Sequence, residues 1–235
     1  MWLKLERQGQ VLWQVRKWRD WTWLKHGFST RCSGSMVELH NRDEFAETFF
    51  FPLPWVTAQQ VHGSHVTLVQ APYLEQYHET DGLLTSEHGV VLATFYADCV
   101  PLLFADPVKK VVGTAHAGWR GTQKQIGVNM VRALVETFHC NPHQIEVGIG
   151  PSIGPCCYTV SQNVAEFFPN SVTPALETSK YQLNLWHENF MQLVSVGILP
   201  SNIHSARVCT HCSQEFFSYR REKTPSRMAS LIGMD

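Results

Sequence analysis

The feature that most constrains this chain is a series of short apolar runs, joined by short links, that begins at Val56. The runs HVTLVQ, DGLLT, VVLATFYADC, PLLFAD and KKVVGTAHA are separated by turn-forming pairs such as His88-Gly89 and Asp106-Pro107. A parallel pair of strands needs a crossover of about a dozen residues, and these links are shorter. The pattern therefore predicts strands with antiparallel or mixed pairing.

Helical patterns appear on either side of this stretch. Apolar residues recur at helical spacing from Ile126 to Phe138, and a second helix is expected over residues 185–196. A short helix is expected in VSQNVAEFF, with Ser161 as its N-cap. The run DEFAETFFF (residues 43–51) predicts one or two helical turns that end before Pro52.

Further strands are expected at both ends of the chain. They are VLWQV (11–15), WTWLKHGF (21–28), IEVGIG (145–150) and IHSARVC (203–209), and residues 216–235 then close the chain as a polar segment. A chain of 235 residues with 44% hydrophobic content can bury a sizeable core. Together these patterns predict an α+β fold, a mixed α/β sandwich, in a single domain spanning residues 1–235.

Composition and charge narrow the functional class. The net charge of −1 gives no indication of nucleic-acid binding, and no apolar run reaches the length of a membrane span. The first residues lack the apolar core of a secretory signal, so we expect a soluble, cytoplasmic protein whose seven cysteines are reduced. Four tryptophans lie close together within residues 13–23, where we expect them to pack in and around the core: Trp13, Trp18, Trp21 and Trp23.

Three residues with metal-ligand chemistry stand at the ends of apolar runs: His62 in QVHG, Cys99 in ATFYADC and His116 in AHAGWRG. Two imidazoles and a thiolate suit zinc or copper, and three protein ligands with one open position are usual in catalytic zinc sites. From these residues alone, Cys99 has three possible roles. It is a metal thiolate, a nucleophile activated by His116 or His62, or an inert core residue.

Other residues near these runs are candidates for substrate contact. Trp119 and Arg120 follow His116, and an aromatic face beside a guanidinium suits a flat, anionic or phosphate-bearing substrate. Arg31 lies in the polar turn STRCSGS, from which a loop arginine could reach a ligand. Asp98 precedes Cys99, and strand alternation places it on the opposite face unless the strand bends.

A second cysteine pattern occurs later in the chain. CTHC (Cys209 to Cys212) has the spacing of half a zinc knuckle, but the adjacent pair Cys156-Cys157 does not have the spacing of the other half. The spacing therefore does not favour a structural zinc site there.

Six motifs in order resemble one known family: QVHG, DGLLT, ADCVPLLFADP, VVGTAHAGWRGT, IGPSIGPCCYTV and the C-terminal FFSYRR with RMA. From about His26 onward the chain resembles the YfiH-type laccase-domain (polyphenol oxidase-like) family of multifunctional purine nucleoside phosphorylases. The resemblance implies a mixed α/β sandwich and a zinc site, with copper possible, formed by His62, Cys99 and His116. It also implies phosphorolysis of adenosine, inosine and methylthioadenosine, with adenosine deamination.

The resemblance also implies roles for further residues and leaves other activities open. Arg31 and Arg120 would hold phosphate or purine oxygen as catalytic cations, and Trp119 would contact the substrate. The turn after Arg31 is shorter than in the family, and Ser226 stands where glycine is common, with Arg227 as the equivalent arginine. Members have also been described as copper-dependent polyphenol oxidases and as hydrolases that edit peptidoglycan precursors.

Three rival functions can be set against this one. A metal-free cysteine hydrolase would use Cys99 as nucleophile and His116 as base. Multicopper oxidases need paired H-x-H runs, and this sequence has none. A non-enzymatic interaction protein would rest on the tryptophan-rich N-terminus but would leave the six motifs unexplained.

Overall fold

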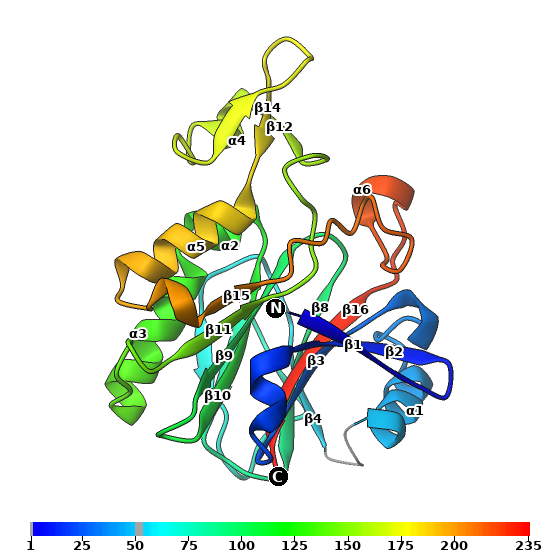
Figure 1. Cartoon of the computed structure of the whole chain (residues 1–235), viewed down its shortest axis with the longest axis vertical. Coiled ribbons are helices and arrows are strands. Elements are labelled where there is room, and N and C mark those ends of the chain that lie inside the picture. Colours follow the sequence, from blue (N-terminus) through cyan, green and yellow to red (C-terminus); the bar gives the residue numbers. More distant parts are fainter. Residues whose placement is uncertain (1, 50–53) are drawn as a thin grey trace.

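The computed structural model describes residues 2–49 and 54–235, and their strands form three sheets (Figure 1). The seven-stranded sheet contains, in spatial order, β1 (Trp2–Arg7), β2 (Gln10–Val15), β3 (Leu24–Ser29), β16 (Met228–Met234), β8 (Val90–Tyr96), β4 (Trp55–Ala58) and β6 (Gln76–Tyr77). The six-stranded sheet contains β15 (Ile203–Ser205), β11 (Glu146–Ile149), β9 (Val100–Asp106), β10 (Val111–Ala117), β7 (Gly82–Thr85) and β5 (Val66–Leu68). The small third sheet contains β12 (Thr159–Ser161), β14 (Lys180–Leu183) and β13 (Val172–Pro174).

Helices cover the outer faces of the two large sheets. The α-helices are α1 (Leu39–Phe49), α2 (Trp119–Gln123), α3 (Ile126–Phe138), α4 (Gln162–Ala165), α5 (Leu185–Ser195) and α6 (Tyr219–Glu222). Short 3-10 turns cover Arg16–Asp20, Arg31–Ser33 and Pro200–Asn202. Within residues 2–49 and 54–235, no helix is both long and apolar enough to cross a membrane.

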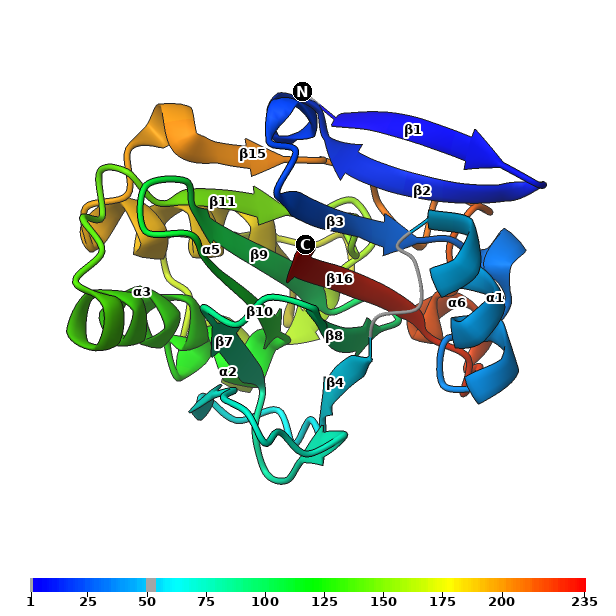
Figure 2. The ribbon, with the colours of Figure 1, turned by 90° about the horizontal axis from the view of Figure 1, so that it is seen from below.

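The layers follow from three hydrophobic clusters. One cluster fills the space between the two large sheets and includes Val56 and Ile232 from one sheet and Leu103 from the other. A second cluster joins the six-stranded sheet to α3 and α5, and a third joins the seven-stranded sheet to α1. Figure 2 shows α1 on one side of the molecule and α3 and α5 on the other. The predicted mixed α/β sandwich is confirmed.

Most of the predicted elements are present. Strands β9 and β10 pair antiparallel, whereas β4 pairs parallel with β8 and β5 pairs parallel with β7, so mixed pairing is confirmed. Helix α3 ends at Phe138 because His139 adopts a left-handed conformation with φ of 54°. Helix α5 begins after Asn184, whose side chain accepts a hydrogen bond from His187 N. Helix α4 follows Ser161 at the expected N-cap position, but the Ser161 side chain makes no capping hydrogen bond and the helix ends at Ala165.

The prediction for the C-terminal segment was wrong. Residues 203–209 form a strand only as far as Ser205, and residues 228–234, expected in a polar segment, form β16. Strand β16 is buried along its whole length and pairs with both β3 and β8 at the centre of its sheet. Small residues such as Ser230 and Gly233 interrupt the apolar pattern of this strand in the sequence. Glycine is required at position 233 because a Cβ there would lie 2.5 Å from Val90 O.

Two N-terminal predictions need adjustment. Helix α1 begins at Leu39, earlier than expected, and the end predicted around residues 50–52 lies outside the described residues. Residues 21–23 form a turn and not the start of a strand, and β3 begins only at Leu24.

The tryptophans pack against the core, as predicted. Trp18 has no exposed surface and stacks on Trp21 at a ring distance of 5.9 Å, and Trp21 stacks on Trp23 at 5.8 Å. Trp13 is partly buried against the cluster between the sheets. Stacked aromatic rings of this kind bury a large apolar area.

His26 is a buried titratable group in β3. Its side chain is 1% exposed, and its Nε2 accepts a hydrogen bond from Val15 N at 3.0 Å. Burial disfavours the charged ring and lowers the pKa of His26 to about 3. The folded protein therefore holds this imidazole neutral at pH values where the unfolded chain protonates it.

We predict that stability falls as the pH decreases from about 6.5 toward 3, by about 1.4 kcal/mol per pH unit from this group alone. The sign follows because the unfolded state binds a proton that the folded state excludes. His26→Gln, which keeps a hydrogen-bond acceptor but does not titrate, should flatten the slope in urea unfolding measured across this range. The exposed His40→Gln serves as control, and an unchanged slope in His26→Gln would contradict the prediction.

Candidate metal centre

His62, Cys99 and His116 come together, with one ligand atom of each within 4.8 Å of the others. His62 lies in the loop after β4, Cys99 lies in the bend between β8 and β9, and His116 lies in β10. Because β9 and β10 pair antiparallel with His116 opposite Pro101, His116 lies next to the bend that carries Cys99. The two imidazole rings meet edge to face with centroids 4.8 Å apart.

A glycine makes room for this cluster. A Cβ built on Gly118 would lie 3.0 Å from Cys99 Sγ, 3.2 Å from His62 Cδ2 and 3.7 Å from His116 Cε1. Any side chain at this position would push into the space that the three ligands share. Gly118 of the AHAGWRG motif is therefore part of the site.

Asp81 holds both histidines in place. Its carboxylate, which has no exposed surface, accepts hydrogen bonds from the backbone N–H groups of Val61 (3.1 Å), His62 (3.1 Å) and Gly63 (2.7 Å). It also pairs with His116 Nδ1 at 2.8 Å. His62 has a positive φ of 58°, which helps successive N–H groups converge on one anion. Although burial raises the pKa of Asp81, these hydrogen bonds outweigh it and lower the pKa overall.

The thiol and the imidazole favour each other's charged forms. Burial raises the pKa of Cys99, but the facing charge of His116 and hydrogen bonds from both histidines lower it to about 6. Burial lowers the pKa of His116, but Cys99 and Asp81 raise it to about 9. A thiolate at neutral pH is the form that binds a metal ion or attacks an electrophile.

This donor set fits a metal ion. Asp81 pairs with the Nδ1 atom of His116, which leaves Nε2 to bind the metal, as in many carboxylate–histidine–zinc arrangements. The set has three protein ligands, the number usual when zinc keeps a position open for water or substrate. Two imidazoles and one thiolate suit zinc or copper.

The cluster lies at the base of a cleft of about 540 Å³. Its lining comprises Val37, Ala58, Gln60, His62, Phe95, Ala97, Cys99, His116, Tyr219 and Arg227. The side-chain amide of Gln60 pairs with the backbone of Phe95. It donates a hydrogen bond to the Phe95 carbonyl at 2.8 Å and accepts one from the Phe95 N–H at 2.7 Å. It therefore fixes the loop that carries His62. Arg227 is held at the cleft by bonds from one guanidinium nitrogen to the carbonyls of Thr224 and Ser226, both at 2.9 Å.

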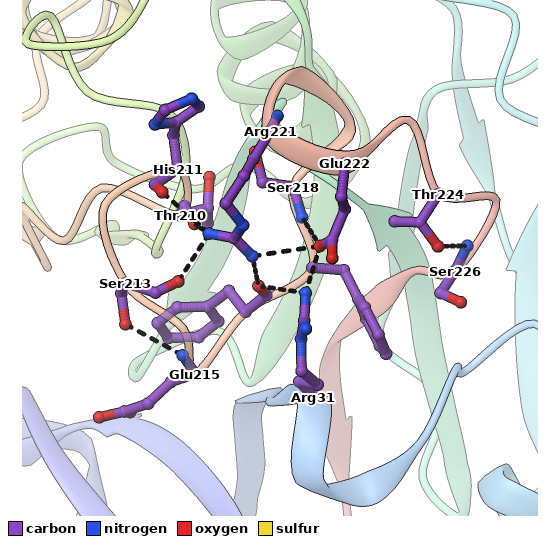
Figure 3. Close-up of polar contacts among 12 residues, drawn as sticks. Arg31, Thr210, His211, Ser213, Glu215, Ser218, Arg221, Glu222, Thr224 and Ser226 are labelled. Carbon is purple, nitrogen blue, oxygen red and sulfur yellow. Dashed lines mark hydrogen bonds and ion pairs between the residues drawn. The ribbon is translucent and has the colours of Figure 1, made fainter.

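Arg31 is not in the lining of this cleft. Its guanidinium pairs with Glu222, donates to Phe216 O at 3.4 Å and lies 4.9 Å from the centroid of the Phe217 ring (Figure 3). The N–H of Ser218 is the main cause that lowers the pKa of Glu222, followed by Arg31. The structure thus places Arg31 in a polar network that holds the loop before α6.

Trp119 and Arg120 also lie outside the cleft lining, at the start of α2. Trp119 stacks on Phe167 at 6.4 Å, and the Arg120 guanidinium lies 4.4 Å from the centroid of the Trp119 ring. Burial raises the pKa of Tyr158, and so does the charge of Cys99, whereas Arg220 and Arg120 lower it. Arg120 therefore acts electrostatically on the phenol of Tyr158, whose pKa also responds to the charge of Cys99.

Two neighbours of the ligands are excluded from the cluster. Asp98 has a φ of 87°, and its carboxylate accepts from Thr210 Oγ1 at 2.7 Å and from Arg220 N at 2.6 Å. Its carboxylate therefore binds these donors and not the ligand cluster, but residues 97–99 form a bend, so strand alternation is not the reason. His65, three residues after His62, is exposed and does not join the cluster.

Sequence reasoning missed several contributors to the site. Asp81 is the first residue of the DGLLT motif, and a carboxylate directly before an apolar run was the available signal. Tyr219, at the cleft, is the tyrosine of FFSYRR. Gln60 is the first residue of the QVHG motif, but its role was not predicted because it depends on pairing with the backbone of Phe95 in β8.

Comparison with known proteins supports the resemblance. Residues 21–235 match the family described as multi-copper polyphenol oxidoreductase laccase. The chain belongs to this family. Among its relatives, the purine nucleoside phosphorylase YlmD of Geobacillus stearothermophilus is 41% identical over 213 residues, covering 83% of this chain and 78% of the relative. YlmD of Bacillus subtilis is also 41% identical, over 211 residues that cover 83% and 76% of the two chains.

Solved structures share the fold. The crystal structure of the hypothetical protein YfiH from Bacillus licheniformis aligns with a TM-score of 0.89 at 30% identity, covering 100% of this chain and 99% of that one. The crystal structure of YlmD from Geobacillus stearothermophilus aligns with a TM-score of 0.88 at 33% identity, covering 98% and 97% of the two chains.

We predict that Asp81→Asn weakens metal binding by about 10- to 100-fold, the usual cost of removing a carboxylate that supports a metal-bound histidine. The amide cannot accept all four N–H groups and carries no charge to orient His116. Metal affinity measured by competition with a chromogenic chelator would test this.

Asp106→Asn is the matched control, because Asp106 is also a fully buried carboxylate but caps the turn at the far end of β9. Equal loss of metal affinity in both variants would show that Asp81 acts only through general stability.

Proposed function

We propose that this chain is a zinc-dependent purine nucleoside phosphorylase with adenosine deaminase activity. The observation that carries the proposal is the convergence of His62, Cys99 and His116 at the base of a cleft that also holds the cation of Arg227. The names of the relatives support the reaction class, because the YlmD proteins of two bacilli are purine nucleoside phosphorylases.

The cleft offers complementary surfaces for the two substrates. Phosphate is an anion, and Arg227 presents a guanidinium whose fork geometry suits phosphate oxygens. The ring of Tyr219 is half exposed and offers a flat face for the purine. In phosphorolysis a phosphate oxygen bonds to the ribose C1′ while the bond from C1′ to purine N9 breaks, and the purine takes up a proton.

The residues around the candidate ligands hold these ligands in position for this chemistry. A zinc ion on the three ligands would supply a Lewis acid with an open position. Asp81 keeps the proton of His116 at Nδ1 and fixes the ring direction. Gln60 and Asp81 together hold the loop that carries His62, so the ligands need little rearrangement when substrate arrives. Deamination would use the same cleft to exchange the adenine amino group for oxygen from water, with release of ammonia.

We predict that the purified protein releases adenine and ribose 1-phosphate from adenosine only when phosphate is present, and forms inosine without it. A strong chelator should abolish both activities, and added zinc should restore them. His62→Ala should lower the rates by at least about a hundredfold, as loss of a metal ligand removes the Lewis acid. The exposed His65→Ala is the control and should keep both rates.

The same assay separates the rival functions. Base release that survives the chelator but not thiol alkylation would replace the proposal with the metal-free cysteine hydrolase. Activity toward phenols that requires copper, with no turnover of nucleosides, would replace it with the polyphenol oxidase.

We also predict that Arg120→Lys lowers turnover by about tenfold or more while zinc content stays at the wild-type level, because lysine lacks the planar fork of arginine. Steady-state kinetics and metal analysis on the same preparation would measure both. If zinc is lost in proportion to activity, Arg120 supports the metal centre and not the substrate.

A further inference from the structure

Four cysteines form a second cluster that shares no residue with the first. Cys156 and Cys157 lie in the turn between β11 and β12, whereas Cys209 and Cys212 lie in the loop between β15 and α6. All four sulfur atoms lie within 4.8 Å of one another. The sequence spacing did not favour a shared site here, so the structure corrects that expectation.

The sulfur distances suit a shared ion better than a covalent bond. Cys212 Sγ lies 3.7 Å from Cys156 Sγ and 3.3 Å from Cys157 Sγ. Sulfur atoms bound tetrahedrally to one zinc ion through bonds of about 2.3 Å lie about 3.8 Å apart. A disulfide would bring two sulfurs to about 2.05 Å, and all four cysteines are free thiols.

The backbone holds the two cysteine-bearing loops together without help from the thiols. Ser152 N donates to Val208 O and Thr210 N donates to Ser152 O, both at 3.1 Å, which forms a short parallel bridge. Next to this bridge, Gly154 N donates to Cys209 Sγ at 3.2 Å. An N–H donor to a sulfur is a typical outer contact of a thiolate that binds a metal.

Arg221 fixes the shape of the loop that carries Cys209 and Cys212. Its guanidinium donates to the carbonyls of Thr210 and His211, both at 2.8 Å, and of Ser213 at 3.0 Å (Figure 3). The loop therefore curves around a partly buried cation, and this curvature directs two cysteines toward the opposite turn. The ligands are set by hydrogen bonds that do not depend on an ion.

We propose that Cys156, Cys157, Cys209 and Cys212 bind a zinc ion in a closed, tetrathiolate site with a structural role. Soft thiolate ligands select zinc among the common divalent ions, and four protein ligands leave no open position for substrate. Cys156 and Cys212 are exposed, which gives the ion a path from solvent.

The site would stabilise the region next to Cys99. Ile153 N donates to Asp98 O at 2.9 Å, and Thr210 Oγ1 donates to the Asp98 carboxylate. Both loops of the cysteine cluster therefore contact the residue that precedes Cys99. An ion that binds only the folded loops adds its binding free energy to their stability.

Metal analysis of the full-length protein, purified under reducing conditions, tests the proposal. We expect two zinc ions per chain in the wild type and one in Cys212→Ser or in Cys156→Ser, both at exposed positions. Cys32→Ser, at an exposed cysteine outside both clusters, is the control and should keep two. The double variant His62→Ala/His116→Ala should keep the ion of the cysteine cluster and lose the other.

Cobalt spectroscopy distinguishes the two sites without any activity measurement. Cobalt(II) bound to thiolates gives an intense charge-transfer absorption that grows with the number of thiolates. This absorption should persist in the His62→Ala/His116→Ala variant and disappear when Cys212→Ser is added.

Two results would overturn the proposal. One is a wild type whose single zinc ion is unaffected by Cys212→Ser and Cys156→Ser. The other is a disulfide among the four cysteines as the main form in protein trapped by acid and alkylated. Because each site has its own variants, failure of the nucleoside assay would leave this result unaffected.

Discussion

One buried carboxylate connects the parts of the molecule that form the metal centre. Asp81 accepts three successive backbone N–H groups around His62 and pairs with the imidazole of His116 in β10. A carboxylate without exposed surface is stable only when such donors replace water. The histidines therefore depend on Asp81 for position, and Asp81 depends on them for its charge.

The sheets supply the rigid base for this arrangement. Between them, the hydroxyl groups of Thr94, Thr114 and Ser230 lie 2.7 to 3.0 Å apart, and the Tyr96 hydroxyl joins this group and donates to Ala115 O at 2.9 Å. Ala115 immediately precedes His116. A satisfied polar network of this kind fixes the spacing of strands more strictly than apolar packing alone. The backbone beside His116, the candidate ligand on β10, is thus tied to Tyr96 in β8, while its side chain pairs with Asp81.

Local patterns predicted the elements whose environment is uniform. Helix α3 has one apolar face, and β9 is apolar up to its last residue, so spacing and composition sufficed. Strand β16 was not predicted, because its small residues do not give a strand pattern in the sequence. They allow close contact with the neighbouring strands, and this contact is visible only in the assembled sheet. His62, Cys99 and His116 were predicted as candidate ligands because each ends an apolar run, and the structure brings them together. Asp81 and the four-cysteine cluster were missed because their partners are distant in sequence, and loop geometry alone brings them together.

The central position of β16 has a consequence for how the chain reaches its fold. This strand separates β3 from β8, so the seven-stranded sheet has a gap at its centre until residues 228–234 insert. Contacts between strands so far apart in sequence slow folding, because a long loop must close before any pairing energy is gained. During synthesis, the earlier strands expose apolar faces and unpaired edges for as long as β16 is missing, which makes the nascent chain dependent on protection from aggregation.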